Sequence, residues 1–135
     1  MNAGRLLAAG GIDSMRLRLL IHPIRPESVQ IRPAPRWLRR VWGKGIRAMT
    51  IRHRVYVEPD LLTGQTRKDA LLLVHELVHV RQWHDLGVFG FLWRYLSDYL
   101  RGRLKGLDHR KAYLEISLER EARRLAALFE GTVEG

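Results

Sequence analysis

The chain has 135 residues, of which 46% are hydrophobic, and this is enough apolar material for one core but too little for two. It contains no cysteine, so a disulfide framework and a thiolate metal site are both excluded, and any metal must bind His, Asp or Glu. The formal net charge is +10, and its excess is concentrated in residues 1–60, which hold 12 Lys and Arg against 4 acidic residues.

The N-terminal segment, residues 1–30, is expected to be basic and loosely ordered, with the folded domain spanning residues 31–135. The basic half favours an anionic partner such as nucleic acid, anionic lipid or an acidic protein, although a solvated surface explains it equally well. The apolar residues 6–9 are too few for the core of a signal peptide. Residues 86–93 are too few to cross a bilayer, so we expect a cytoplasmic protein without a transmembrane segment.

Two segments in the first half of the chain have sequence patterns typical of extended backbone. Four of the five prolines fall within residues 23–35, which predicts an extended segment that is not a helix. Residues 46–57 alternate between largely apolar and polar side chains with a period of two. This period predicts a β-hairpin that turns near Arg52 and His53.

Helical signals dominate the rest of the chain. Thr66 followed by Asp69 forms a capping-box pattern, which predicts that a helix begins there and runs to about residue 84. Leucines and tyrosines at helical spacing from residue 92 onward predict a second helix, which ends near residues 102–106. A third apolar stripe predicts a helix over residues 113–129.

The first predicted helix contains the pattern His-Glu-x-x-His, since residues 71–80 are apolar except for His75, Glu76 and His79. Residues four apart project from the same side of a helix, so both imidazoles can bind one ion while Glu76 touches a water on it. Zinc lowers the pKa of such a water to about 7, and the carboxylate can accept its proton. A core helix whose polar residues are satisfied by neighbours is the competing interpretation, but burying these groups unpaired would be costly.

This segment resembles the metallopeptidase signature of the zincin superfamily. The resemblance includes uncharged residues at Val74, Leu77 and Val78 and a hydrophobic residue at Val80. Zincins divide according to their third metal ligand. In gluzincins this ligand is a glutamate from a later helix, whereas metzincins take it from a position shortly after the motif.

Residues 119–122, Glu-Arg-Glu-Ala, resemble the Glu-x-x-Ala stretch of several compact bacterial zincin families, including the ImmA/IrrE group and short HExxH domains. The resemblance implies that Glu119 is the third ligand and that the alanine packs against the active-site helix. Glu121 is the alternative ligand. The chain departs from the family pattern at Arg123, where Asp or Asn is frequent, and at Ser117, where proline is common.

Other candidate ligands are weaker. His84 and His109 lie outside any motif, and a lone histidine is more often a surface residue than a ligand. The metzincin pattern would select Asp85, but Gln82 stands where that pattern needs a glycine to turn the chain. No methionine follows residue 49, so the Met-turn of that group is also absent.

Three features bear on how a substrate would bind. Amide hydrolysis needs a donor to the developing oxyanion, and either Tyr113 or His109 could supply it. The hairpin at residues 46–57 precedes the motif helix as the edge strand of a zincin sheet does, and such an edge can bind an extended peptide. The aromatic residues 86–93 could form a substrate wall or a membrane-surface patch, but core packing is the favoured interpretation.

Together these patterns predict an α+β fold: a minimal zincin-like domain with a short antiparallel hairpin or sheet, an HExxH helix and two further C-terminal helices. The resemblance implies a gluzincin-type metallopeptidase acting on a peptide or protein substrate, with Zn²⁺ on His75, His79 and Glu119 and with Glu76 as general base. Iron also suits two histidines and one carboxylate. Two alternatives stay open: a catalytically silent zinc-bearing regulatory or nucleic-acid-binding module that uses the basic half, and a metal-free helical interaction domain.

Overall fold

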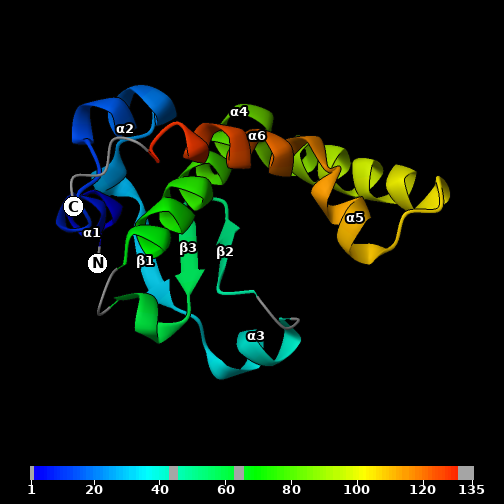
Figure 1. The fold of residues 1–135 in the computed structure, drawn as a ribbon, viewed down its shortest axis with the longest axis horizontal. Coiled ribbons are helices and arrows are strands. Elements are labelled where there is room, and N and C mark those ends of the chain that lie inside the picture. The colour runs from blue at the N-terminus through cyan, green and yellow to red at the C-terminus, as the bar shows by residue number, and fades with distance from the viewer. Residues whose placement is uncertain (1, 43–45, 63–65, 131–135) are drawn as a thin grey trace.

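The protein has an α+β fold in which one long helix crosses a small mixed sheet, as seen in a computed structural model that describes residues 2–42, 46–62 and 66–130 (Figure 1). The strands are β1 (Gln30–Pro33), β2 (Ala48–Ile51) and β3 (Arg54–Val57). Their order is β1-β3-β2, with β1 parallel and β2 antiparallel to the central β3. The long helix α4 (Arg67–Leu104) covers one face of this sheet, so the sheet and helix expected from the sequence are both present.

The predicted hairpin is confirmed. Strands β2 and β3 pair from Ala48 with Val57 to Ile51 with Arg54, which leaves residues 52 and 53 as the two-residue turn. Arg52 adopts a positive φ of 57°, as turns of this length require. Strand β1 lies in the proline-rich segment, for which we predicted extended backbone but did not predict pairing with the hairpin. It is an edge strand that ends at its proline, and this is where a sheet tolerates a residue without an N–H.

The N-terminal segment differs from the expectation of loose order. Helices α1 (Ala3–Ala9) and α2 (Ser14–Ile21) pack into the main core, and the side chains of Leu7, Leu17 and Ile21 are at most 2% exposed. Both helices begin at side-chain caps on a polar residue. The high arginine content of this segment concealed its apolar face, since the arginines project outward from the same helices.

Helix α4 joins two predicted helices into one element. Its start is confirmed, because Thr66 and Asp69 form the reciprocal capping box. The helix does not end near residue 84 but continues to Gly87, whose φ of 72° and ψ of 171° interrupt the helical path. A second limb then runs to Leu104, within two residues of the predicted end. The glycine is required at the interruption because this backbone region is essentially closed to other residues.

The third predicted helix is divided in two. Residues 113–129 contribute to α5 (His109–Leu114) and to α6 (Ser117–Ala127), with the non-helical Ile116 between them. Asp98 on α4 stabilises this break, since its carboxylate accepts hydrogen bonds from both the backbone N–H and the hydroxyl of Ser117. The break turns α6 back along α4, with which it makes its main contacts.

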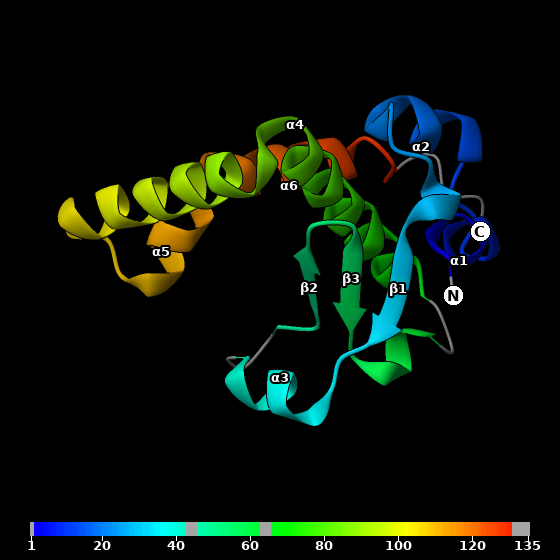
Figure 2. The ribbon, with the colours of Figure 1, turned by 180° about the vertical axis from the view of Figure 1, so that it is seen from behind.

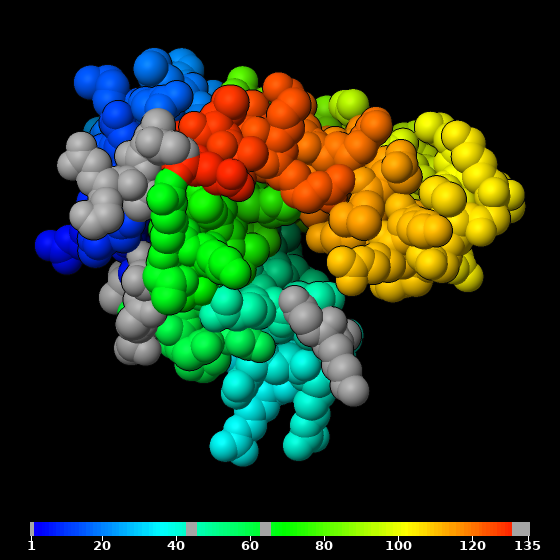
Figure 3. Space-filling model, viewed as in Figure 1, coloured from blue at the N-terminus to red at the C-terminus, as the bar shows by residue number. Residues whose placement is uncertain are grey.

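The remaining elements are short. They are η1 (Pro26–Ser28), α3 (Arg36–Val41) and η2 (Pro59–Leu62). Figure 2 shows that α3 and the second limb of α4 both lie on the β2 side of the sheet, whereas α1 and α2 lie on the β1 side. In the space-filling view the second limb of α4 and α5, residues 88–114, project beyond the body of the molecule (Figure 3). We call this projection the arm. Among the described helices, none combines the length and the apolar character needed to cross a membrane.

Candidate metal centre

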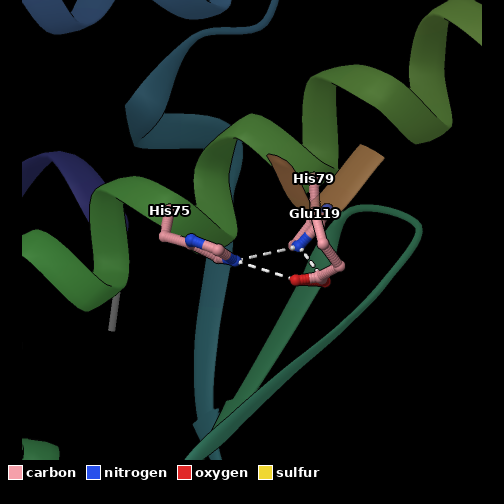
Figure 4. Close-up of side chains that lie close together, drawn as sticks. All are labelled: His75, His79 and Glu119. Atoms are coloured by element: carbon pink, nitrogen blue, oxygen red, sulfur yellow. Dashed lines mark hydrogen bonds and ion pairs between the residues drawn. The ribbon is translucent and has the colours of Figure 1, made fainter. Parts of the chain in front are cut away.

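Two helices bring three candidate ligands together (Figure 4). His75 and His79 lie one turn apart on the first limb of α4, and Glu119 reaches them from the first turn of α6. The Nε2 atoms of the two histidines are 3.2 Å apart. Glu119 Oε2 lies 3.2 Å from His75 Nε2, and its Oε1 lies 2.7 Å from His79 Nε2. Among the described residues, these three form a cluster whose donor atoms all lie within 4.8 Å of one another.

The spacing of these atoms suits a tetrahedral zinc ion. Ligand atoms roughly 2.1 Å from a tetrahedral ion lie roughly 3.4 Å from one another, because of the tetrahedral angle at the metal. The distance between the two histidine nitrogens and that from His75 to Glu119 are both close to this value. The shorter contact of Glu119 with His79 is a hydrogen-bond distance, which a proton can occupy when no ion is bound.

The hydrogen bonds of Gln82 assign the tautomer of His79. The Gln82 amide nitrogen donates to the carbonyl of Leu118 at 3.0 Å and to Glu121 Oε1 at 3.1 Å, so its oxygen must face the other way. That oxygen lies 2.8 Å from His79 Nδ1, which therefore carries the proton. Neutral His79 then presents the lone pair of its Nε2 atom to His75 and Glu119. This lone pair can face the Glu119 carboxylate only with a cation between them, which a bound metal supplies. Without a metal, a proton on Nε2 takes that place, and His79 donates to Glu119 Oε1 at 2.7 Å.

Glu121, the alternative third ligand, lies outside the cluster. Its carboxylate accepts the hydrogen bond from Gln82 and so supports His79 indirectly. Arg123 stands where the zincin pattern that the sequence resembles often has Asp or Asn. Its guanidinium donates to the carbonyl of Leu114 at 2.6 Å and therefore links α6 to α5. In this chain Gln82, supported by Glu121, braces His79, and the residue at position 123 does not.

The electrostatics of the cluster reflect its burial. Burial favours protonation of Glu119, but the hydrogen bonds and charges of His75 and His79 outweigh it and hold the pKa of Glu119 well below its usual range. Burial lowers the pKa of His79, yet its hydrogen bond and charge interaction with Glu119 raise that pKa overall. Glu119 is therefore an anion at neutral pH, and His79 holds a proton more tightly than a free imidazole does.

Glu76 lies beside the cluster and is held by the sheet. Its side chain is buried, and Thr50 on β2 donates a 2.6 Å hydrogen bond to Glu76 Oε2. The threonine hydroxyl also lies 3.2 Å from the Glu76 carbonyl oxygen. Because these contacts fix the carboxylate against the edge strand, the glutamate needs no further ordering before it accepts a proton.

The two suggested oxyanion donors lie in different places. Tyr113 is close to the cluster, since its hydroxyl donates to Glu119 Oε2 at 2.8 Å, and Tyr95 contacts the other oxygen at 3.5 Å. Burial and the charge of Glu119 raise the pKa of both tyrosines, so each keeps its proton to donate. His109 instead pairs with the Tyr99 hydroxyl on the exposed arm and is absent from the walls of the cleft described below.

The remaining candidates lie apart from the cluster. His84 makes an edge contact with the ring of His53, the second residue of the hairpin turn. Asp85 is about half exposed and forms an ion pair with Arg81 one turn earlier on α4. Neither belongs to the metal cluster, in agreement with their prediction as weaker candidates.

A cleft of about 640 Å³ opens beside the cluster. One wall is strand β2, and the opposite wall is the start of the second limb of α4, where Phe91, Leu92 and Tyr95 lie. The polar residues in its lining include Glu76, His79, Tyr113 and Glu119, together with Thr50 and Arg52 of the hairpin. The cleft is therefore an apolar groove that leads to the candidate ligands.

The structure identifies three site residues that sequence reasoning missed, namely Thr50, Gln82 and Tyr95. Gln82 could have been found from its spacing, because it lies three residues after His79 and therefore on the same face of the helix. Thr50 could not have been found in this way, since its role depends on the packing of β2 against α4. Comparisons with protein-family models, curated proteins and solved structures found no match to this chain.

Proposed function

We propose that this protein is a zinc-dependent metallopeptidase in which His75, His79 and Glu119 bind the ion and Glu76 is the general base. The observation that supports this most strongly is the convergence of two imidazole nitrogens and a buried carboxylate at the spacing of a tetrahedral site.

Glu76 and Tyr113 have distinct roles in the proposed hydrolysis. Zinc bound there would supply a water of lowered pKa and polarise the carbonyl under attack. Glu76, held by Thr50, accepts the proton of that water and can pass it to the leaving nitrogen. Tyr113 keeps its phenolic proton and can donate it in a hydrogen bond to the oxyanion.

A peptide is the substrate class that the cleft favours. Strand β2 ends the sheet on the cleft side, and no described strand pairs with its outer edge. An extended peptide can add to such an edge through backbone hydrogen bonds, and alternate side chains then enter the apolar groove. The carbonyl groups of that peptide would run past Glu76 and the candidate ligands.

The first experiment measures metal content and peptide hydrolysis on protein purified without a metal-binding tag. We expect about one zinc per chain in the wild type, loss of zinc in Glu119→Ala, and retained but weaker binding in Glu121→Ala. Glu115→Ala is a matched control, because this glutamate is exposed and lies on the same stretch of chain. Glu76→Gln should keep the zinc and lose hydrolysis.

The outcomes separate the rival functions. A wild type that binds no zinc after reconstitution contradicts the metal site and favours the helical interaction domain. Zinc binding without any difference in hydrolysis between wild type and Glu76→Gln contradicts the enzyme and favours the silent regulatory or nucleic-acid-binding module. That module would bind DNA with a strong dependence on salt.

A further inference from the structure

The arm exposes an apolar stripe that the fold does not use. On the second limb of α4, Phe89 is 89% exposed, Trp93 77% and Leu104 88%, and Leu96 and Leu100 are each more than half exposed. Core packing was the favoured interpretation of residues 86–93, and for Phe89 and Trp93 it is wrong, since both side chains are exposed. With 3.6 residues per turn, the five positions fall within a sector roughly 80° wide, so they form one continuous ridge along the helix.

The same limb already has a second face that packs the core. Phe91 and Tyr95 join Trp83 in a stack that covers Ile116 and Leu118. Further along, Gly102 lies so close to α5 that a Cβ atom there would meet Ala112 at 3.1 Å. Because α5 and α6 pack against this face, the exposed stripe does not contribute to the folded core. Exposed apolar ridges of this kind are typical of surfaces that bind a protein or a membrane.

The charges of the arm indicate which kind of partner the stripe binds. Residues 88–114 hold six Lys and Arg against two Asp, and all six cations are exposed. They are Arg94, Arg101, Arg103, Lys105, Arg110 and Lys111. The arm is thus an amphipathic helix with aromatic and leucine side chains on one face and basic residues beside it. This combination matches helices that lie in the interface of a membrane containing anionic lipid.

We propose that the arm docks on the surface of an anionic membrane, with the stripe from Phe89 to Leu104 inserted among the lipid acyl chains. A second copy of the chain is a poorer occupant, because two arms face to face would bring together like charges on a protein of net charge +10. Nucleic acid would satisfy the cations and could stack on the two aromatic rings, but it offers nothing to the three leucines.

The docked arm would bring the cleft to the membrane surface. Leu92 and Leu96 line the cleft and are also exposed at the edge of the stripe, so the apolar wall of the cleft continues into the proposed lipid contact. On the other side of the opening, Ile46 and Ile51 are exposed as well. The groove therefore opens close to where lipid acyl chains, or a polypeptide bound at the membrane, would lie.

The test is co-sedimentation of purified protein with vesicles of phosphatidylcholine that contain 30% phosphatidylserine. We expect binding that weakens as salt is raised and is much weaker to vesicles of phosphatidylcholine alone. The double variant Phe89→Ser/Trp93→Ser should lose about tenfold or more in affinity. Met15→Ser/Leu19→Ser is the matched control, because these exposed apolar residues lie on α2, away from the arm, and it should bind as the wild type does.

Circular dichroism of the variants checks that they are folded, and the fluorescence difference between wild type and Trp93→Phe reports whether Trp93 enters lipid. Absence of vesicle binding in the wild type, or equal loss in the α2 control, overturns the proposal. So does a wild-type dimer in sedimentation velocity that the arm variant dissociates, because the stripe would then bind a second copy. The inference is independent of the metal centre, so Glu76→Gln should bind vesicles like the wild type.

Discussion

Thr50 on the edge strand donates a 2.6 Å hydrogen bond to the carboxylate of Glu76 on the motif helix. This contact couples the two parts of the candidate site, because the strand that would bind the substrate also holds the proposed base. The position of the base is thus set by the packing of β2 against α4, not by the helix alone.

Replacement of Thr50 by valine tests this coupling. The two side chains have nearly the same shape, so Thr50→Val removes the hydroxyl with little effect on packing. We expect kcat to fall between about 2- and 10-fold, the range of one hydrogen bond, with zinc content unchanged. Thr50→Ser keeps the hydroxyl and should retain most of the activity. A parallel loss of zinc in Thr50→Val would show that the threonine supports the metal site instead of the base.

Gln82 orients the proposed metal ligand His79, as Thr50 orients the proposed base Glu76. Its side-chain oxygen lies 2.8 Å from His79 Nδ1, and removal of such a support costs about 10- to 100-fold in metal affinity. We therefore expect Gln82→Ala to weaken zinc binding by that amount, measured by competition with a chelator. Glu121→Ala should have a smaller effect, because the carbonyl of Leu118 still orients the amide. An effect of Glu121→Ala larger than that of Gln82→Ala would indicate that Glu121 is itself a ligand.

Sequence patterns predicted those features that depend on local spacing. The period of two located the hairpin, the capping box located the start of α4, and the motif together with Glu119 named the three residues that the structure brings together. Each of these signals lies within a few neighbouring residues, or rests on a resemblance between short segments.

Features that depend on the choice between packing partners were not predictable. The second limb of α4 carries two apolar faces, and spacing alone cannot say which of them α5 and α6 will cover. The leucines follow the helical period more regularly, yet the face that is buried contains Phe91 and Gly102. The break at Ile116 escaped prediction for a similar reason, since the cap that stabilises it comes from Asp98 on another helix.

The effect of pH should have opposite signs in the metal-free and the zinc-bound protein. The pKa of His79 is raised above the unfolded value of 6.5, although burial alone would lower it, because Glu119 stabilises the imidazolium. The metal-free protein therefore has this stabilisation in full below about pH 6.5 and loses it as pH rises through the folded pKa. Zinc needs neutral His79, so zinc binding strengthens over the same interval.

Urea denaturation measures both effects. Between pH 6 and pH 8 we expect the free energy of unfolding of the protein in chelator to decline, and that of the protein in excess zinc to rise. Glu119 does not contribute to either trend, because its lowered pKa keeps it ionised throughout. His79→Gln should abolish the decline in chelator. A decline that persists in this variant would assign the titration to another group.

The interruption of α4 at Gly87 is the last feature that we expect to be testable by substitution. Its φ of 72° and ψ of 171° lie in a region that is essentially restricted to glycine, although a Cβ atom there would contact nothing within 4 Å. Gly87→Ala should therefore destabilise the metal-free protein by about 1 to 3 kcal/mol through backbone strain alone. Gly90→Ala is the matched control, since this glycine is helical and its Cβ would meet only Leu86, at 3.3 Å. We expect the control to lie within about 1 kcal/mol of the wild type, as helix propensity offsets the close contact. Equal stabilities of the two variants would mean that α4 straightens without cost, and that the direction of the arm is not set at Gly87.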